Sequence, residues 1–493
     1  MAALKQLAGQ TAIYGLSSMV GRLLYYFLVP LHTARLLTSE YGVITDVYAS
    51  IAFLSILLTY GMETTFFRFQ SRTEDPKKVL ATALSSILVS TFIFWGICTV
   101  FFPHIVNAIG YSANPNYVLY FMLIVGLEAL VAIPQANLRA TNRPLKFAAV
   151  NIVSILINIG LNLFFIGYCM KVYQAGASDF WTETFYNPSI GLGYIFIANV
   201  FASASKLLML LPQYRFLKAG LSWKLLKTML KYTWPLLLMG LGGMINETFD
   251  RFLLKYLLAP VIGMEAALEQ EGIYGACYKL SILITLFVQA FRFAAEPFFF
   301  NQFKAIDKEK TYAKVMSIFV GFCLTMFLGV TLYLELVKGF LRNEAYWTGL
   351  GVVPILLIAN ICLGVVYNLS IWYKLSDKTK YGAKLAFLGA IVTLSVNFMF
   401  IPKYGFMAAA WATLLCYATM MVCSYFLGQR HFPVPYNVKR IALYSIFAAL
   451  IYWIDDWVFG EQTHILALAA KLLLILGFAG FVYFSEKPKK VLL

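Results

Sequence analysis

Long apolar runs separated by short polar segments recur along the whole chain. Each run has about 20 residues, the length that an α-helix needs to cross the hydrocarbon core of a membrane. Between the eleventh and twelfth runs, Pro402, Lys403 and Gly405 predict a tight turn. The fourteen predicted spans are 10–32, 41–66, 80–102, 116–138, 147–169, 190–213, 232–257, 272–298, 313–337, 347–372, 382–401, 405–427, 441–458 and 463–484. The pattern predicts an all-α polytopic membrane protein with fourteen transmembrane helices.

Lysine and arginine residues are distributed unevenly between the polar segments. If the N-terminus lies in the cytoplasm, the cytoplasmic segments carry several times as many of these residues as the outer ones. This bias predicts that both termini are cytoplasmic. It also accounts for the formal net charge of +16 without a nucleic-acid partner, because basic loops face the anionic leaflet. No cleavable signal peptide is visible, and we expect the first helix to be retained.

Composition agrees with a membrane protein. Of the 493 residues, 61% are hydrophobic and 13% are charged, whereas soluble proteins are about 25% charged. A soluble enzyme and a secreted disulfide scaffold are therefore excluded. The seven cysteines show no metal-ligand spacing, so we interpret them as small core residues and expect no metal and no cofactor. They are Cys98, Cys169, Cys277, Cys323, Cys362, Cys416 and Cys423.

The two halves of the chain resemble each other. At an offset of 233 residues, Glu63 aligns with Glu296, and the two phenylalanines that follow each of them align as well. Because the offset covers an even number of spans, matched helices run in the same direction. The repeat is therefore parallel, with a pseudo-two-fold axis along the membrane normal. The predicted domains are an N-terminal lobe of six helices at 1–218, a C-terminal lobe of six helices at 219–430 and an extra helix pair at 431–493.

Charged residues inside the predicted spans are the main functional signal. Each costs about 2.5–3.5 kcal/mol at the middle of a bilayer, so each should face a partner or a water-filled cavity. The twelve that we single out are Arg22, Lys206, Arg251, Lys279, Arg292, Lys471, Asp46, Glu63, Glu128, Glu247, Asp250 and Glu296. Nine of them lie on the first, second, seventh and eighth spans, which the repeat makes equivalent. We therefore expect these four helices to face a central cavity.

Two interpretations of these charges are open. In the functional one, the cations bind an anionic group, because arginine makes bidentate contacts with phosphate. These candidates are Arg22, Arg251, Lys279 and Arg292. The acidic residues then act as gates or as sites where H⁺ or Na⁺ enters; these candidates are Asp46, Glu63, Glu247, Asp250 and Glu296. In the structural interpretation, pairs at i,i+4 spacing such as Glu247 with Arg251, and Arg292 with Glu296, only fix the register of the helices.

Three charges lie apart from this group. Lys206 and Lys471 are isolated on outlying helices, where a snorkelling side chain or a local partner is the better interpretation. Glu128 is ambiguous in the same way. Asp455 lies next to a short outer loop, and we expect it to be a solvated cap.

Two sequence runs carry a resemblance to a known family. Residues 272–281 (GIYGACYKLS) and 289–300 (QAFRFAAEPFFF), together with the spans and the repeat, resemble the polysaccharide-transporter branch of the multidrug/oligosaccharidyl-lipid/polysaccharide (MOP) exporter superfamily. The resemblance implies a V-shaped bundle of two lobes. It also implies a flippase that moves an undecaprenyl-diphosphate-linked oligosaccharide from the cytoplasmic to the periplasmic leaflet of the bacterial inner membrane, for surface polysaccharide biosynthesis. The four cations above would then be candidates for binding the diphosphate.

The same resemblance bears on the last two helices and on one acidic outer segment. The last two helices are similar to the extra pair of the lipid II flippase branch, which there forms a groove for the lipid tail. The acidic outer segment with Glu265, Glu269 and Glu271 is interpreted as an insertion in an outer loop, without a role. The expected partners are a polyprenyl-diphosphate-linked glycan and membrane lipids, and we expect a monomer that is not an enzyme. The driving force is left open between H⁺, Na⁺ and the membrane potential.

Alternatives from the same superfamily are a lipid II flippase and a cation-coupled multidrug extruder. An extruder of cationic drugs needs mainly acidic cavity residues and usually has twelve spans, which the arginines and the extra helix pair argue against. A membrane glycosyltransferase or acyltransferase is a different class. A glycosyltransferase needs carboxylates in a substantial first outer loop, but here that loop covers only 33–40. An acyltransferase needs a histidine inside the membrane, but every histidine lies at a span end or in a loop.

Overall fold

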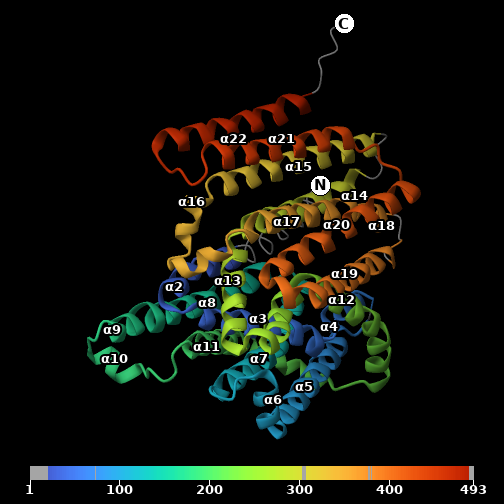
Figure 1. Cartoon of the computed structure of the whole chain (residues 1–493). Helices are drawn as coiled ribbons and strands as arrows, with labels where there is room; N and C mark the ends of the chain where they lie inside the picture. The colour runs from blue at the N-terminus through green and yellow to red at the C-terminus, as the bar shows by residue number, and fades with distance from the viewer. Residues whose placement is uncertain (1–19, 73, 303–306, 376–377, 379, 488–493) are drawn as a thin grey trace. The chain divides into compact units, whose positions relative to one another are not determined.

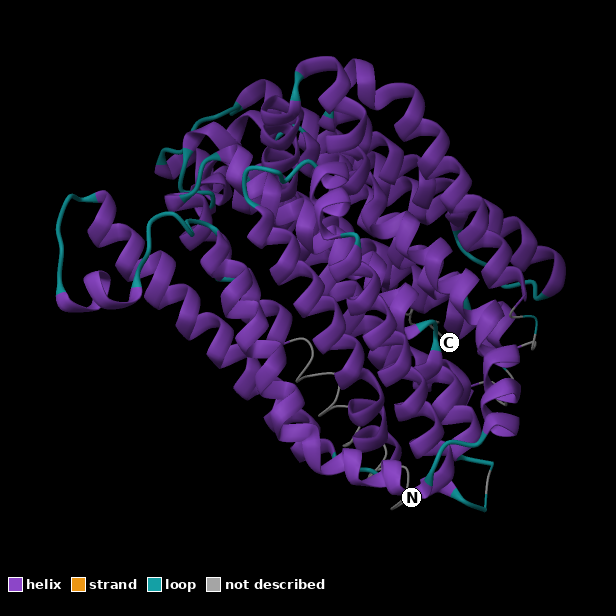
Figure 2. Cartoon of the chain, turned by 90° about the horizontal axis from the view of Figure 1, so that it is seen from below, coloured by secondary structure: helices purple, strands orange, loops and turns teal. Residues whose placement is uncertain are grey.

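The computed structural model describes residues 20–72, 74–302, 307–375, 378 and 380–487. All regular structure in this part of the chain is helical (Figures 1 and 2). Among these described residues, eleven helices are long and apolar enough to cross a membrane, or twelve if the bent pair α13 and α14 forms one span. The prediction of an all-α, multi-pass membrane protein is confirmed. The count of fourteen stays a prediction, since half of the first predicted span lies outside the described residues.

The chain divides into two compact units. The first comprises Met1–Lys255 with Ile262–Gly272, and the second comprises Tyr256–Val261 with Ile273–Leu493. The repeat and its boundaries after residues 218 and 430 stay a prediction. In chain order, the described helices that precede α13 are α2 (Leu28–Arg35), α3 (Thr38–Thr59), α4 (Met62–Gln70), α5 (Pro76–Val100), α6 (Phe102–Ile109), α7 (Pro115–Ala140), α8 (Pro144–Asn162), the π-helical turn η1 (Leu163–Cys169), α9 (Met170–Gln174), α10 (Phe180–Phe185), α11 (Gly193–Leu210), the 3₁₀ segment η2 (Leu211–Ala219) and α12 (Trp223–Ile262).

Local sequence signals set the ends of several helices. Proline occupies the first position of α5, α7 and α8 (Pro76, Pro115 and Pro144), where its missing N–H would have no helical partner in any case. At the start of α5, the Asp75 side chain also accepts a hydrogen bond from the backbone N–H of Lys78 at 3.1 Å. These three helices therefore begin where the sequence makes a helix start least costly.

Two breaks between helices occur at residues that adopt positive φ. Tyr60 and Gly61 separate α3 from α4 with φ values of 39° and 76°. Gly405, with φ of 57°, separates α19 (Lys380–Tyr404) from α20 (Phe406–His431). The predicted turn at this point is confirmed. A glycine has no Cβ, so it reaches this backbone region without strain.

Helix α13 (Met264–Leu280) approaches α3 at backbone contact distance. A Cβ on Gly42 would lie 1.9 Å from the carbonyl oxygen of Leu268, and one on Gly272 would lie 1.8 Å from that of Thr38. Only glycine permits such an approach. The expectation that residues 265–271 form an outer loop is wrong, because this segment is helical and Glu271 in it is completely buried. That the segment is an insertion stays a prediction.

The second unit contains α14 (Ile282–Gln302), α15 (Lys308–Leu332), α16 (Leu334–Val337), the 3₁₀ turns η3 (Lys338–Phe340) and η4 (Glu344–Gly349), α17 (Val352–Leu369), α18 (Ile371–Leu375), α19, α20, α21 (Val438–Val458) and α22 (Ile465–Glu486). Helix α20 packs against both α17 and α19. Helices α21 and α22, the predicted extra pair, lie along α15 (Figure 1). The pair is thus attached to this unit mainly through α15.

Candidate functional site

The first unit contains a fully buried ion pair between α3 and α12. The Lys255 ammonium nitrogen lies 2.5 Å from Asp46 Oδ2, and the two side chains are 0% and 1% exposed. The Tyr111 hydroxyl donates a hydrogen bond to the same oxygen at 2.6 Å, and its ring centroid lies 4.3 Å from the ammonium nitrogen. Because water is excluded, the attraction between the charges is much stronger than at a surface.

Glu271 on α13 adds a second carboxylate to this region. It is completely buried, and neither of its carboxylate oxygens has a hydrogen-bond partner among the described residues; the same holds for Asp46 Oδ1. Asp250 and Arg251 on α12 act on Glu271 electrostatically, as do Asp46 and Lys255. We call these five residues the buried charge cluster. With every group ionised, its three carboxylates exceed its two cations by one charge, so the cluster can hold a proton or a monovalent cation.

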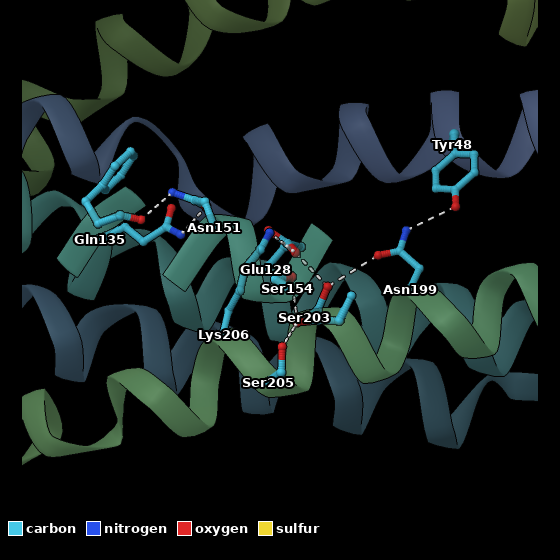
Figure 3. Close-up of polar contacts among 11 residues, drawn as sticks. Tyr48, Glu128, Gln135, Asn151, Ser154, Asn199, Ser203, Ser205 and Lys206 are labelled. Atoms are coloured by element: carbon cyan, nitrogen blue, oxygen red, sulfur yellow. Dashed lines mark hydrogen bonds and ion pairs between the residues drawn. The ribbon is translucent and has the colours of Figure 1, made fainter. Parts of the chain in front are cut away.

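A second polar network connects α7, α11 and α3 (Figure 3). Lys206 lies 2.9 Å from Glu128, and the Ser203 hydroxyl donates to the same carboxylate oxygen at 2.6 Å. The Asn199 amide donates to the Tyr48 hydroxyl at 3.2 Å. Asn199, Ser203 and Lys206 share one face of α11, since they are four and three residues apart. Lys206 and Glu128 are therefore partners of each other, which resolves the two ambiguous charges on these helices.

Glu63, a predicted gate residue, forms an ion pair with Arg139 at the end of α7. The guanidinium carbon of Arg139 also lies 5.2 Å from the ring centroid of Phe67 and 5.7 Å from that of Phe147. Glu63 is thus held within the first unit by a partner from a predicted loop. Glu296, its repeat counterpart, has a side chain outside the described part of the structure.

The remaining predicted residues of the first unit are more accessible. Arg22 and Glu247 are exposed. Arg251 donates a hydrogen bond to the backbone carbonyl of Glu247 at 3.0 Å and lies 3.8 Å from Asp250 Oδ1. The expected i,i+4 contact between residues 247 and 251 therefore reaches the main chain of Glu247.

The other two predicted cations belong to the second unit. Lys279 is partly buried on α13. Arg292 is exposed on α14, with its guanidinium carbon 4.7 Å from the ring centroid of Tyr367. Arg22 and Arg251 belong to the first unit, so a common anion site formed by all four cations stays a prediction.

Two ion pairs join α21 to α22. Lys471 lies 3.5 Å from Asp455 and donates to the carbonyl oxygen of Gly460 at 3.2 Å. Arg440 lies 3.2 Å from Glu486. Lys471 thus has a local partner. The expectation that Asp455 is a solvated cap is wrong, because only 6% of the residue is exposed; the pairing with Lys471 removes it from water.

An apolar groove of about 580 Å³ lies between α21 and the bundle of α15, α17 and α20. Its walls are almost entirely hydrophobic. They include Phe327, Ile358, Cys362, Phe426 and Tyr452. A groove of this volume lies in the range typical of ligand sites. Its apolar walls can bind an alkyl chain through van der Waals contacts.

Sequence reasoning missed several residues of these sites. Lys255 lies two residues before the end of the seventh predicted span, where a lysine is easily assigned to the membrane interface. Tyr111 and Glu271 lie in predicted loops, and Arg139 follows a span. The acidic segment 265–271 was the one available signal for Glu271, but charge alone does not distinguish an exposed loop from a buried helix.

The fold is similar to the folds of solved multi-pass membrane transporters and of a lipid flippase. The lipid II flippase MurJ in an inward closed conformation matches with a TM-score of 0.71 at 13% identity, over 96% of this chain and 99% of that one. An inward-facing multidrug resistance MATE family transporter of the MOP superfamily matches with a TM-score of 0.62 at 13% identity, over 85% and 94%. The MATE multidrug transporter DinF-BH matches with a TM-score of 0.61 at 16% identity, over 86% and 96%.

The family itself is shown by sequence. The model of a family described as "Polysaccharide biosynthesis protein" matches residues 7–303, and the chain belongs to this family. No curated protein matches the chain at a significant level. The structural matches above are to transporters and a flippase rather than to catalytic enzymes.

Breaking the buried ion pair should destabilise the first unit. Lys255→Met leaves Asp46 charged and without its ammonium partner, and we expect a loss of about 3–5 kcal/mol in the free energy of unfolding. Thermal unfolding of the detergent-purified protein measures this. The double variant Lys255→Met/Asp46→Asn removes both charges and should recover much of the loss. Equal stability of Lys255→Met and the wild type would contradict the burial of the pair.

Proposed function

We propose that this protein is a flippase for a lipid-linked oligosaccharide. Its substrate is a glycan attached to undecaprenyl diphosphate, and it moves from the cytoplasmic to the periplasmic leaflet of the bacterial inner membrane for surface polysaccharide biosynthesis. Membership of the polysaccharide biosynthesis family, in a chain whose fold matches a lipid II flippase, is the observation that carries the proposal. The proposed topology has fourteen spans, two lobes related by the parallel repeat, and both termini in the cytoplasm.

The chemistry of a polyprenyl diphosphate fits two kinds of surface in this chain. Its diphosphate needs cations, and the proposed ligands are Arg22, Arg251, Lys279 and Arg292. Arginine suits this role because its planar guanidinium stays charged and makes bidentate contacts with phosphate oxygens. Its isoprenoid tail needs apolar surface, and the apolar groove beside α21 provides it. In the proposed cycle, the head group binds from the cytoplasmic side, and the two lobes rock to release it outside while the tail stays in lipid.

A proton is the proposed coupling ion, and Glu271 is its proposed carrier. An ionised carboxylate without a hydrogen-bond partner is very costly in a dry interior. The groups that face Glu271 are Asp46 from α3 and Asp250, Arg251 and Lys255 from α12. They leave one negative charge in excess, which a proton on Glu271 neutralises. The predicted acidic candidates Asp46 and Asp250 then belong to the coupling site, while Glu63, Glu247 and Glu296 are proposed as gate residues.

A lipid II flippase is the second candidate function. MurJ is matched over 96% of this chain, whereas the MATE structures above are matched over 85–86%. The chain is therefore covered more fully by a lipid flippase than by multidrug transporters. Both lipid substrates share a polyprenyl diphosphate, so their glycans distinguish the two functions.

Removing two of the proposed anion ligands should strongly reduce transport. We expect Arg22→Ala/Arg251→Ala to lower export of the surface glycan by about tenfold or more, because two charge-assisted contacts to the diphosphate disappear. Surface glycan is measured in a strain that depends on this gene, at matched protein levels. The matched control Lys224→Ala/Lys227→Ala removes two exposed lysines of α12. Unchanged export in the arginine variant would refute the charged-centre proposal.

Filling the apolar groove should block the lipid tail. Ile358→Trp places a bulky ring in a wall of the groove, and we expect flipping of a fluorescent polyprenyl-linked glycan in proteoliposomes to fall severalfold. Ile318→Trp on α15 is the control, since Ile318 is 45% exposed and does not line the groove. If both tryptophan variants transport equally well, the tail does not use this groove.

Replacing Glu271 by glutamine should uncouple transport from protons. The amide mimics the protonated carboxyl permanently, so an imposed pH gradient should no longer accelerate flipping in proteoliposomes. The control Glu265→Gln changes an exposed glutamate of the same helix and should keep the response. A full response to the pH gradient in Glu271→Gln would contradict the proton carrier, and a response to a sodium gradient alone would exclude the proton.

A further inference from the structure

A second cavity lies at the end of the second unit where α15 and α21 begin and α22 ends. Its volume is about 680 Å³, and residues from all three helices line it. Unlike the apolar groove, it is polar and basic. The charged and hydroxyl residues that line it are Lys314, Ser317, Lys439, Arg440, Ser485, Glu486 and Lys487, and we call this cavity the basic pocket.

The charges of the basic pocket are not balanced. Glu486 is its one lining carboxylate among the described residues. That carboxylate is occupied by Arg440 at 3.2 Å and by the Tyr444 hydroxyl, which donates to it at 2.9 Å. In the described part of the chain, Lys314 and Lys439 have neither an ion pair nor a hydrogen bond through their ammonium groups. Four cations against one carboxylate leave the pocket with a formal excess of three positive charges, while Glu486 holds Arg440 in place.

Apolar side chains line the same pocket. Leu443 and Phe484 are lining residues that are 52% and 69% exposed. The Lys487 ammonium nitrogen lies 5.0 Å from the ring centroid of Phe484 and 4.8 Å from that of Tyr483. In a membrane-spanning helix pair, exposed leucine, phenylalanine and tyrosine side chains face lipid. The pocket thus places cations directly beside a surface for acyl chains.

We propose that the basic pocket binds the phosphate headgroup of an anionic membrane phospholipid, with the acyl chains against Leu443 and Phe484. Lysine and arginine donate charge-assisted hydrogen bonds to phosphate oxygens, and basic pockets between transmembrane helices suit anionic lipid headgroups. A free phosphate ion would use the cations alone and leave the apolar side unused. A phospholipid uses both the cations and the apolar side of the pocket.

The pocket is separate from the groove that we assign to the transported lipid. On α21, Val438, Ile441 and Ser445 line the apolar groove, whereas Lys439, Arg440 and Leu443 line the basic pocket. The two sets lie on different faces of one helix. A phospholipid in the basic pocket would therefore hold α21 and α22 against α15 from the side opposite the groove, as a resident lipid rather than as cargo.

Native mass spectrometry of the full-length, detergent-purified protein tests the proposal. The probes are phosphatidylglycerol, zwitterionic phosphatidylethanolamine, undecaprenyl diphosphate and inorganic phosphate, each added separately. The variant is Lys314→Ala/Lys439→Ala/Lys487→Ala, which keeps Arg440 and its ion pair with Glu486. We expect the variant to bind phosphatidylglycerol on the order of tenfold more weakly than the wild type, because each cation near a lipid surface contributes to binding. Binding of phosphatidylethanolamine should stay weak in both proteins.

The control variant Lys224→Ala/Lys227→Ala/Lys231→Ala removes three exposed lysines of α12 and should bind phosphatidylglycerol like the wild type. Equal phosphatidylglycerol binding by the two triple variants would overturn the proposal. The proposal would also be overturned if the pocket variant lost binding of undecaprenyl diphosphate or inorganic phosphate but still bound phosphatidylglycerol. That result would assign the site to the substrate or to free phosphate. Thermal unfolding without added lipid shows whether the variant is folded. None of these measurements depends on transport, so their outcome neither supports nor contradicts the proposed flippase activity.

Discussion

A charge without a partner is very costly in a hydrocarbon interior, and this constraint explains the buried ion pairs of the described helices. Lys255 pairs with Asp46, Lys206 with Glu128, and Lys471 with Asp455. In each case a lysine side chain reaches a carboxylate on another helix. Each pair therefore fixes the position of one helix against another, because separating them would expose two charges to lipid.

Glu271 departs from this rule, which is why it is the most informative residue of the first unit. It lies next to the backbone contact between α3 and α13. Gly42 and Gly272 allow α3 and α13 to come into contact, and the neighbouring Glu271 is carried into the interior with them. Natural structures keep unsatisfied buried polar groups mainly where function requires them. The contact between two glycines thus lies beside the carboxylate that we propose as the proton carrier.

The helix pair at the end of the second unit presents two surfaces of opposite chemistry. One face of α21 contributes to an apolar groove, and another contributes lysine and arginine to the basic pocket. Ion pairs between α21 and α22 hold the two helices in register. A lipid tail and a lipid headgroup can therefore be recognised at neighbouring sites without competing, because the chemistry of the two faces is opposite.

The sequence by itself determined the class of this protein and the positions of its helices. Long apolar runs require backbone groups to bond within helices, so the eleven candidate spans among the described residues could be read directly. The turn at Gly405 and the need of Lys206 and Lys471 for a partner could be read in the same way. Only the tertiary structure decided which partner each charge has. Lys255, Arg139 and Glu271 join their sites through contacts between residues distant in sequence, and those contacts depend on how closely two helices pack. Hydropathy reports the cost of burying a charge, but it carries no information about the atom on another helix that offsets that cost.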